Sequence, residues 1–209
     1  MTESELKIDD VRIELNGREL LRLDRCVGSG EVLTVMGPSG SGKSTLLAYL
    51  AGFLAPAFRA HGRVWVGSRD VTDLPAEQRH LGLLFQDPLL FPHLSIAENL
   101  CFGIPRNRSD KNRLASASLE EIGLQGFENR DPETLSGGQK ARVALLRTLL
   151  SEPEAVLLDE PFNKLDAALR AEVRDAVFGR LRTAGLPVVL VTHDREDAEA
   201  AGGEVVELG

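Results

Sequence analysis

The sequence is poor in aromatic residues, in cysteine and in long apolar runs. Phe, Tyr and Trp together make up 5% of its 209 residues, and residues 1–48 contain none of them. The two cysteines, Cys26 and Cys101, lack metal-binding spacing, which suits free thiols in a reducing compartment. No stretch approaches the roughly 18 consecutive apolar residues of a membrane-spanning helix. The acidic start is not expected to be a secretory signal, so a membrane role would require a partner.

Basic residues are fewer than acidic ones, 24 Lys and Arg against 32 Asp and Glu. The formal net charge is −8 at pH 7, which argues against a general nucleic-acid-binding protein. The length fits one domain, or one domain with a subdomain. The hydrophobic content of 43% is ordinary for a soluble globular chain.

One glycine-rich segment organises the rest of the chain. It fits the phosphate-loop pattern of Gly, four residues, Gly, Lys and Ser or Thr, and its nine residues are Gly37, Pro38, Ser39, Gly40, Ser41, Gly42, Lys43, Ser44 and Thr45. A short apolar run, residues 32–36, predicts a buried strand before it, and residues 44–54 predict a helix after it. In that context backbone N–H groups and the helix N-terminus can bind phosphates. Lys43 can reach the β- and γ-phosphates, and Ser44 can offer its hydroxyl to Mg²⁺.

The remaining pattern predicts an α/β fold with a mainly parallel core sheet and an antiparallel β subdomain. Antiparallel strands are expected at residues 6–15, 20–27 and 61–67, with a hairpin turn at Asn16-Gly17. Buried strands are expected at 80–85, 155–158 and 188–191, and helices at 140–150 and about 166–184. Residues 88–135 are expected to form a helical subdomain, with helices at 95–103 and 110–122. The core would then comprise residues 1–87 and 136–209 of a single domain.

Polar residues follow several of the predicted strands. Gln86, Asp159, Glu160 and His193 stand at such ends, where ligands bind in parallel sheets. Asp159 is expected to hold Mg²⁺, directly or through water, and Glu160 to polarise the attacking water. Gln86 could reach the metal or the water, and His193 could contact the γ-phosphate or orient the water. Asp194 is expected to cap the following helix, with Asp197 three residues on.

A second anion-binding segment opens the helix predicted from residue 140. Its residues are Ser136, Gly137, Gly138 and Gln139. A helix N-terminus of this composition binds anions by the same physics as the phosphate loop. Because one nucleotide needs only one phosphate loop, we expect the second segment to serve the nucleotide of another subunit.

These motifs, in this order, resemble ABC-type ATPases along nearly the whole chain. Leu135–Gln139 is similar to the family signature. The resemblance implies a subunit that dimerises head to tail, with two ATP molecules between each phosphate loop and the opposite signature. It also implies Glu160 as catalytic base, Asp159 on Mg²⁺, Gln86 as sensor of the γ-phosphate and His193 as its partner.

Residues 91–95 and 97–100 resemble bacterial importer ATPases of the molybdate, sulfate, iron, thiamine and polyamine group. That resemblance implies a membrane permease docked after Gln86, a solute-binding protein, and a location on the cytoplasmic face of the cell membrane. A soluble ABC-type ATPase of repair, translation or iron–sulfur assembly is the alternative, and an exporter ATPase is another. One cassette, no heptads and an acidic balance weigh against the soluble class.

The sequence departs from the family pattern in three places. Leu15 stands where an aromatic residue usually stacks on adenine. Asn163-Lys164-Leu165-Asp166 replaces Ser-Ala-Leu-Asp after the catalytic strand, which puts the subunit contact of its first two residues in doubt. Lys140-Ala141-Arg142 stands where Gln-Gln-Arg is commoner.

Overall fold

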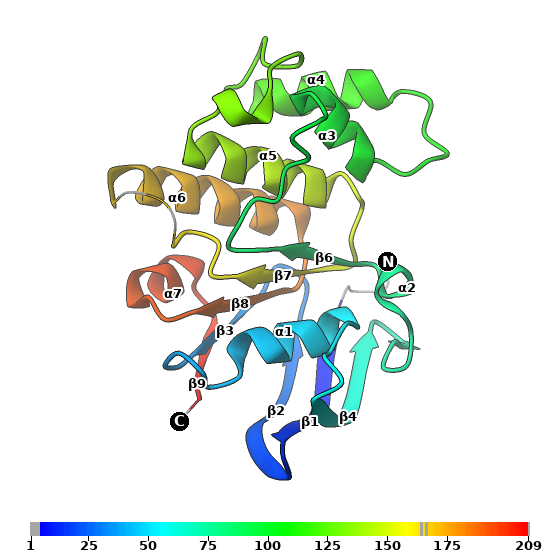
Figure 1. The fold of residues 1–209 in the computed structure, drawn as a ribbon, viewed down its shortest axis with the longest axis vertical. Helices are drawn as coiled ribbons and strands as arrows, with labels where there is room; N and C mark the ends of the chain where they lie inside the picture. The colour runs from blue at the N-terminus through cyan, green and yellow to red at the C-terminus, as the bar shows by residue number, and fades with distance from the viewer. Residues whose placement is uncertain (1–4, 164, 166, 209) are drawn as a thin grey trace. The chain divides into compact units, whose positions relative to one another are not determined.

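The computed structural model describes residues 5–163, 165 and 167–208. It divides into two compact units. The first contains Met1–Leu83, Glu154–Glu160 and Phe178–Gly209, and the second contains Leu84–Pro153 and Pro161–Val177. The predicted helical segment, residues 88–135, lies within the second unit, which also includes the following helix and part of the next. Figure 1 labels the elements along the chain.

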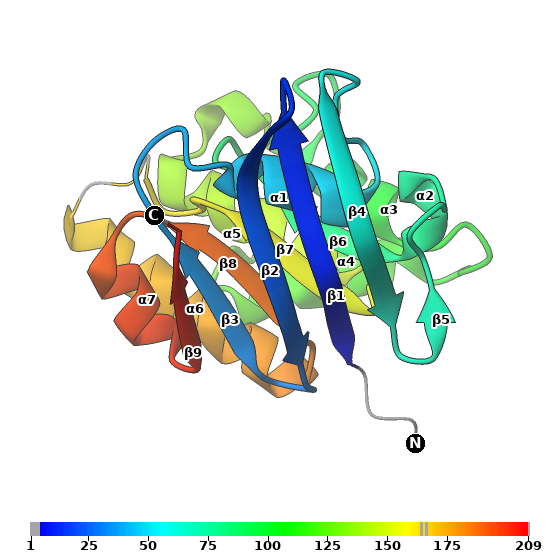
Figure 2. The same ribbon diagram turned by 90° about the horizontal axis from the view of Figure 1, so that it is seen from below.

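An antiparallel sheet forms the N-terminal part of the first unit. Its order is β2 (Arg18–Val27), β1 (Leu6–Leu15), β4 (Phe58–Val66) and β5 (Arg69–Asp70), and its three long strands lie side by side in Figure 2. The turn at Asn16-Gly17 joins β1 and β2, as predicted, with φ values of 53° and 75°. The alternation of apolar and charged residues along β1 is interrupted at Asp9-Asp10, and the register with β2 shifts there, between Ile8 and Val11.

The second sheet has the order β6 (Leu81–Leu84), β7 (Ala155–Asp159), β8 (Val188–Thr192), β3 (Val32–Met36) and β9 (Glu204–Glu207). The pairs β7–β8, β8–β3 and β3–β9 are parallel. Strands β3 and β8 are buried at every residue, as expected for continuous apolar runs covered on both faces. The predicted parallel core is therefore confirmed.

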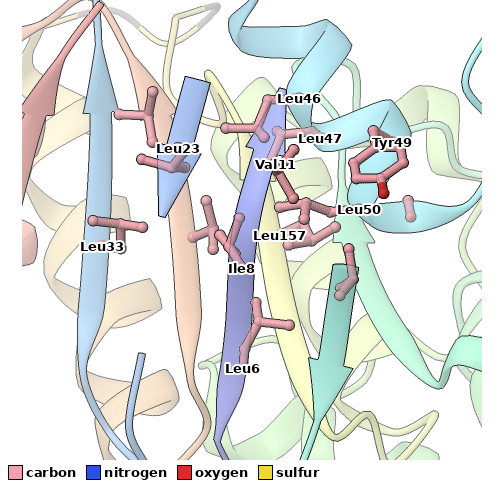
Figure 3. Close-up of a cluster of buried hydrophobic side chains, with 14 of the residues drawn as sticks. Leu6, Ile8, Val11, Leu23, Leu33, Leu46, Leu47, Tyr49, Leu50 and Leu157 are labelled. Atoms are coloured by element: carbon pink, nitrogen blue, oxygen red, sulfur yellow. The ribbon is translucent and has the colours of Figure 1, made fainter. Parts of the chain in front are cut away.

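Helix α1 (Lys43–Ala51) packs into the core of the first unit. Its Leu46, Leu47 and Leu50 lie in one apolar cluster with Ile8 of β1 and Leu157 of β7 (Figure 3). Both sheets therefore hold the helix that begins in the phosphate loop. Short helix α2 (Ala76–Arg79) precedes β6, and α7 (Arg195–Ala201) follows β8.

The second unit is helical. It contains α3 (Ile96–Gly103), α4 (Lys111–Glu121), the 3₁₀ turn η1 (Pro132–Thr134), α5 (Gly137–Leu149) and the start of α6 (Ala167–Ala184). Ile96 and Leu100 of α3, Leu119 of α4, and Val143 and Leu146 of α5 share a buried cluster. The predicted helices at 95–103 and 110–122 are thus present. The helix predicted from residue 140 begins earlier, at Gly137, because Ser136 caps it.

Among the described residues, no helix is long and apolar enough to cross a membrane.

Candidate nucleotide-binding site

Three parallel strands end at the same edge of their sheet. The register pairs Val191 of β8 with Val35 of β3 on one side and with Asp159 of β7 on the other. The residues that follow each strand, among them Gly37, Glu160 and His193, therefore meet at this edge. The backbone N–H of Glu160 donates to the Val191 carbonyl at 2.9 Å, which fixes the end of β7 beside β8.

The phosphate loop is the first component of the site. Gly40 and Gly42 have φ of 88° and 91°, values that favour glycine. A side chain at Gly42 would also collide with the second strand, since its Cβ would lie 2.8 Å from Cδ2 of both Leu20 and Leu21. Close approach of the loop to β2 and a left-handed backbone together require glycine here.

Lys43, the first residue of α1, reaches back to the start of this loop. Its side chain is 7% exposed, and Nζ donates to the carbonyls of Gly37 at 2.9 Å and Pro38 at 3.0 Å. A buried ammonium held only by carbonyl dipoles is costly unless an anion joins it. The loop therefore holds a cation that an incoming phosphate can engage.

Ser44 and Asp159 form the second component. The Ser44 hydroxyl donates to Oδ1 of Asp159 at 3.0 Å. Burial raises the pKa of the Asp159 carboxyl, and the nearby Glu160 charge adds to this, whereas Ser44 and Lys43 oppose it. A half-buried carboxylate with a raised pKa is stabilised by a cation. These two hard oxygen donors fit Mg²⁺, which binds proteins through one or two carboxylates plus substrate phosphates.

Glu160 and His193 form the third component. Nδ1 of His193 lies 3.2 Å from Oε1 of Glu160, so the imidazole can orient the carboxylate. Glu160 has φ of 44°, a left-handed conformation that is uncommon for residues other than glycine, Asn and Asp. Such outliers persist where the surroundings enforce them, and they cluster at functional sites.

The cap of α7 differs from the prediction in one respect. Asp194 accepts a hydrogen bond from the Glu196 N–H at 2.8 Å, which confirms it as the cap. Asp197 does not complete a capping box. It is fully buried, and its carboxylate accepts from the Thr192 hydroxyl at 3.4 Å. In a capping box the Asp194 N–H would donate to Asp197, but here it donates to the Thr192 hydroxyl at 3.0 Å.

The other predicted site residues belong to the second unit. Gln86 is exposed in the segment after β6. The Ser136 hydroxyl accepts from the Gln139 N–H at 3.3 Å, and Oε1 of Gln139 accepts from the Ser136 N–H at 2.9 Å. This capping box orders the start of α5, with Gly137 exposed and Gly138 buried. Of the departures noted above, Lys164 and Asp166 lie outside the described residues.

Two contacts of the loop were not anticipated. Leu20 and Leu21 contact Gly42, and a Cβ at Gly37 would lie 2.9 Å from the carbonyl oxygen of Leu208. Leu208 follows β9, whose short polar sequence gives no strand signal. Only the three-dimensional packing shows that the end of β9 supports the loop.

Comparisons with known proteins agree with this geometry. A family model described as ABC transporter matches residues 20–163. The chain is 45% identical over 199 residues to the "Uncharacterized ABC transporter ATP-binding protein YnjD" of Escherichia coli (strain K12), covering 93% of this chain and 91% of that protein. It is 41% identical over 206 residues to the "Thiamine import ATP-binding protein ThiQ" of Jannaschia sp. (strain CCS1), covering 97% and 88%. It is 40% identical over 196 residues to the "Fe(3+) ions import ATP-binding protein FbpC" of Brucella abortus (strain 2308), covering 92% and 55%.

Proposed function

This chain belongs to the ABC transporter family of ATP-binding, ATP-hydrolysing proteins, and we propose that it hydrolyses ATP with Mg²⁺ to drive a solute importer. The observation that carries the proposal is the cluster in the first unit. There a buried lysine, a serine–aspartate pair and a histidine–glutamate pair meet at one sheet edge. Each pair supplies one part of phosphoryl transfer to water.

Glu160 is the proposed general base. Its carboxylate takes a proton from the water that attacks the γ-phosphorus, and the β–γ bridging oxygen leaves on ADP. His193 holds that carboxylate in position through its 3.2 Å contact. Lys43 exchanges its two carbonyl partners for phosphate oxygens and offsets their charge.

Mg²⁺ would be held by Ser44 and Asp159 of the first unit. Gln86, in the second unit, stays a predicted oxygen donor to the metal. When bound, it would neutralise phosphate charge. Ser44 and Asp159 are already within hydrogen-bond distance, so the two donors are preorganised.

The proposed assembly is a homodimer with ATP sandwiched between subunits. Ser136–Gln139 is the proposed contact to the nucleotide of the partner, because its capped helix start presents backbone N–H groups to an anion. The phosphate loop, residues 37–45, contains one basic side chain, that of Lys43. A donor supplied in trans would complete the stabilisation of transition-state charge.

The second unit carries the proposed docking surface for an integral-membrane permease. Leu89 is 54% exposed and Phe102 is 68% exposed, and the Phe91 ring centroid lies 4.6 Å from that of Phe102. Arg147 near the end of α5 donates to the carbonyls of Leu89 at 2.9 Å and Pro88 at 3.1 Å. Helix α5 thus joins the Ser136–Gln139 segment at one end to this apolar surface at the other.

The importer assignment rests on the names of similar proteins, which are import ATP-binding proteins for thiamine and Fe(3+). A solute-binding protein outside the membrane and a place for this chain on its cytoplasmic face follow from that assignment. The residues of the nucleotide site do not indicate which solute is transported, because the cluster of Lys43, Ser44, Asp159, Glu160 and His193 is suited to phosphates.

The enzymatic part is tested with Glu160→Gln. The amide keeps the size of the side chain but is a poor base, so we expect ATP binding to persist and steady-state hydrolysis to fall by a factor of about 10² or more. Glu77→Gln is the matched control, since Glu77 is exposed on α2 of the same unit. Gel filtration of Glu160→Gln with ATP and Mg²⁺ should show twice the monomer mass. Normal turnover, or a strictly monomeric variant, would contradict the proposal.

The docking surface is tested by crosslinking. His93→Cys, exposed beside Phe91, is combined with Cys26→Ser and Cys101→Ser and treated with a thiol-reactive crosslinker in native membranes. Mass spectrometry should identify a protein with several membrane-spanning helices. Crosslinks to soluble proteins alone would count against an importer.

A further inference from the structure

The residue that follows β9 lies directly behind the phosphate loop. Strand β9 pairs with β3 in parallel, with Glu207 opposite Met36, and the two strands lie side by side in Figure 2. The Leu208 N–H donates to the Met36 carbonyl at 2.8 Å, which extends this pairing by one residue. Leu208 is thereby held at the point where β3 ends and the phosphate loop begins.

Gly37 is the loop residue that packs against Leu208. A Cβ at Gly37 would lie 2.9 Å from the carbonyl oxygen of Leu208 and 3.2 Å from its Cβ. The same Cβ would lie 2.7 Å from Oγ of Ser41, within the loop itself. Because protein interiors are close-packed, Leu208 and Ser41 together restrict the backbone of Gly37.

Gly37 in turn positions the lysine of the loop. Its carbonyl accepts a hydrogen bond from Nζ of Lys43 at 2.9 Å, so the orientation of this carbonyl determines where the ammonium lies before a phosphate arrives. The partly buried side chain of Leu208 packs against the apolar cluster that contains Leu46 and Leu47 of α1. The core therefore holds Leu208, Leu208 restricts Gly37, and Gly37 holds Lys43.

We infer that Leu208 is a positioning residue for nucleotide binding, which keeps the phosphate loop in the conformation that presents Lys43 to the phosphates. The inference rests on the proposed function. A leucine has no group that could take part in phosphoryl transfer, so Leu208 acts through Gly37. Without its side chain the loop populates other conformations, and the apparent dissociation constant rises as the competent fraction falls. In the complex, phosphate oxygens replace the Gly37 carbonyl, so the chemical step is unchanged.

The test compares Leu208→Ala with Val206→Ala. Val206 is also partly buried and packs against the same cluster, but it lies opposite Val35, within β3 and before the loop. Calorimetry measures binding of ADP and of inorganic pyrophosphate, each with Mg²⁺. We expect both to bind about 3- to 10-fold more weakly to Leu208→Ala, as for a loop that is competent in about a third to a tenth of the molecules. Val206→Ala should leave both affinities unchanged.

Steady-state hydrolysis separates positioning from a general loss of structure. In Leu208→Ala, KM for ATP should rise by the same factor as the dissociation constant of ADP, with kcat unchanged. Leu208→Met keeps an apolar side chain of similar volume and should restore most of the affinity. Melting curves establish that each variant is folded, and both alanine variants should melt below the wild type.

Three outcomes would overturn the inference. Unchanged affinities in Leu208→Ala would mean that the loop does not depend on this side chain. An equal loss in Val206→Ala would assign the effect to the stability of β9 as a whole. A lower kcat at unchanged KM would place the effect on the chemical step. Failure of the wild-type chain to bind both ADP and pyrophosphate would instead refute the proposed function.

Discussion

Replacing Arg79 with methionine should destabilise the first unit strongly, although Arg79 is not in the nucleotide site. The residue is 4% exposed. Its guanidinium donates to the carbonyls of Tyr49 and Leu50 at 2.9 Å, of Leu74 at 2.8 Å and of Thr72 at 2.5 Å. Burial lowers its pKa, but an arginine remains charged in proteins. One cation therefore links the end of α1 to the segment before β6.

The magnitude follows from these contacts. The carbonyls of Tyr49 and Leu50 belong to the last turn of α1, where helix carbonyls lack the usual partner four residues on. The Tyr49 carbonyl keeps a second donor, the Gly52 N–H at 3.1 Å, so the loss falls mainly on the carbonyls of Leu50, Thr72 and Leu74. A hydrogen bond lost from a buried acceptor costs about 1 kcal/mol or more. Three such losses, with methionine filling the aliphatic space, give about 3 kcal/mol. At 2–4 °C per kcal/mol, the melting temperature should fall by roughly 6–12 °C.

Thermal and urea denaturation measure this loss, with Arg59→Met as the exposed control. Arg79→Lys should lose most of the same stability, because one ammonium cannot reach four carbonyls in the geometry of a guanidinium. Gly52→Ala provides an independent check and should also be destabilised. Gly52 has φ of 87°, and a Cβ there would lie 2.5 Å from Nε of Arg79. The Gly52→Ala, Arg79→Met double variant should be less destabilised than the sum. A loss below about 1 kcal/mol in Arg79→Met would refute the reasoning.

Three further predictions concern the site itself. Lys43→Ala should abolish nucleotide binding, since it removes the buried cation of the loop; labelled ATP bound near the wild-type level would disprove this. Asp159→Asn should raise the melting temperature at pH 7 without Mg²⁺. The pKa of Asp159 is raised above its ordinary value of 3.8 in the folded chain. The carboxyl therefore ionises more easily in the unfolded chain, and the stability of the fold falls as pH rises from 3.8 through the raised pKa. The variant should lack this dependence of stability on pH. A dependence of its melting temperature on pH equal to that of the wild type would contradict the prediction. Leu15→Tyr should tighten ADP binding by about 2- to 13-fold through a new aromatic face, as calorimetry would show.

Much of the first unit was predictable because its core strands carry unambiguous patterns. The strand at residues 32–36 was predicted with its observed bounds, and the residues after β7 and β8 were expected at one sheet edge. A parallel sheet buried on both faces produces short continuous apolar runs. Parallel topology then brings the strand ends together, so Asp159 and His193 could be placed near the phosphate loop without coordinates.

The unpredicted features depend on packing between distant segments. Strand β9 has the sequence Glu-Val-Val-Glu, and only Val206 of it is partly buried, so no burial pattern marks it. The bulge at Leu20 is visible only from the register between two strands. Asp197 matched a capping position in sequence, but the Asp194 N–H donates to the Thr192 hydroxyl instead. Local sequence rules cannot weigh such competing partners.

The two ends of the nucleotide site differ in how firmly the fold holds them. At the phosphate end, Lys43 is buried, and Asp159 is fixed by Ser44 and by its place in the parallel sheet. At the β1–β2 hairpin, Leu15 is half-buried and Leu20 lies in a bulge of the edge strand β2. Preorganised donors cost little to align when a ligand binds, whereas partly exposed side chains lose entropy when a ligand orders them. Binding energy should therefore come mainly from the phosphates, which is where an enzyme that breaks a phosphoanhydride bond can use it.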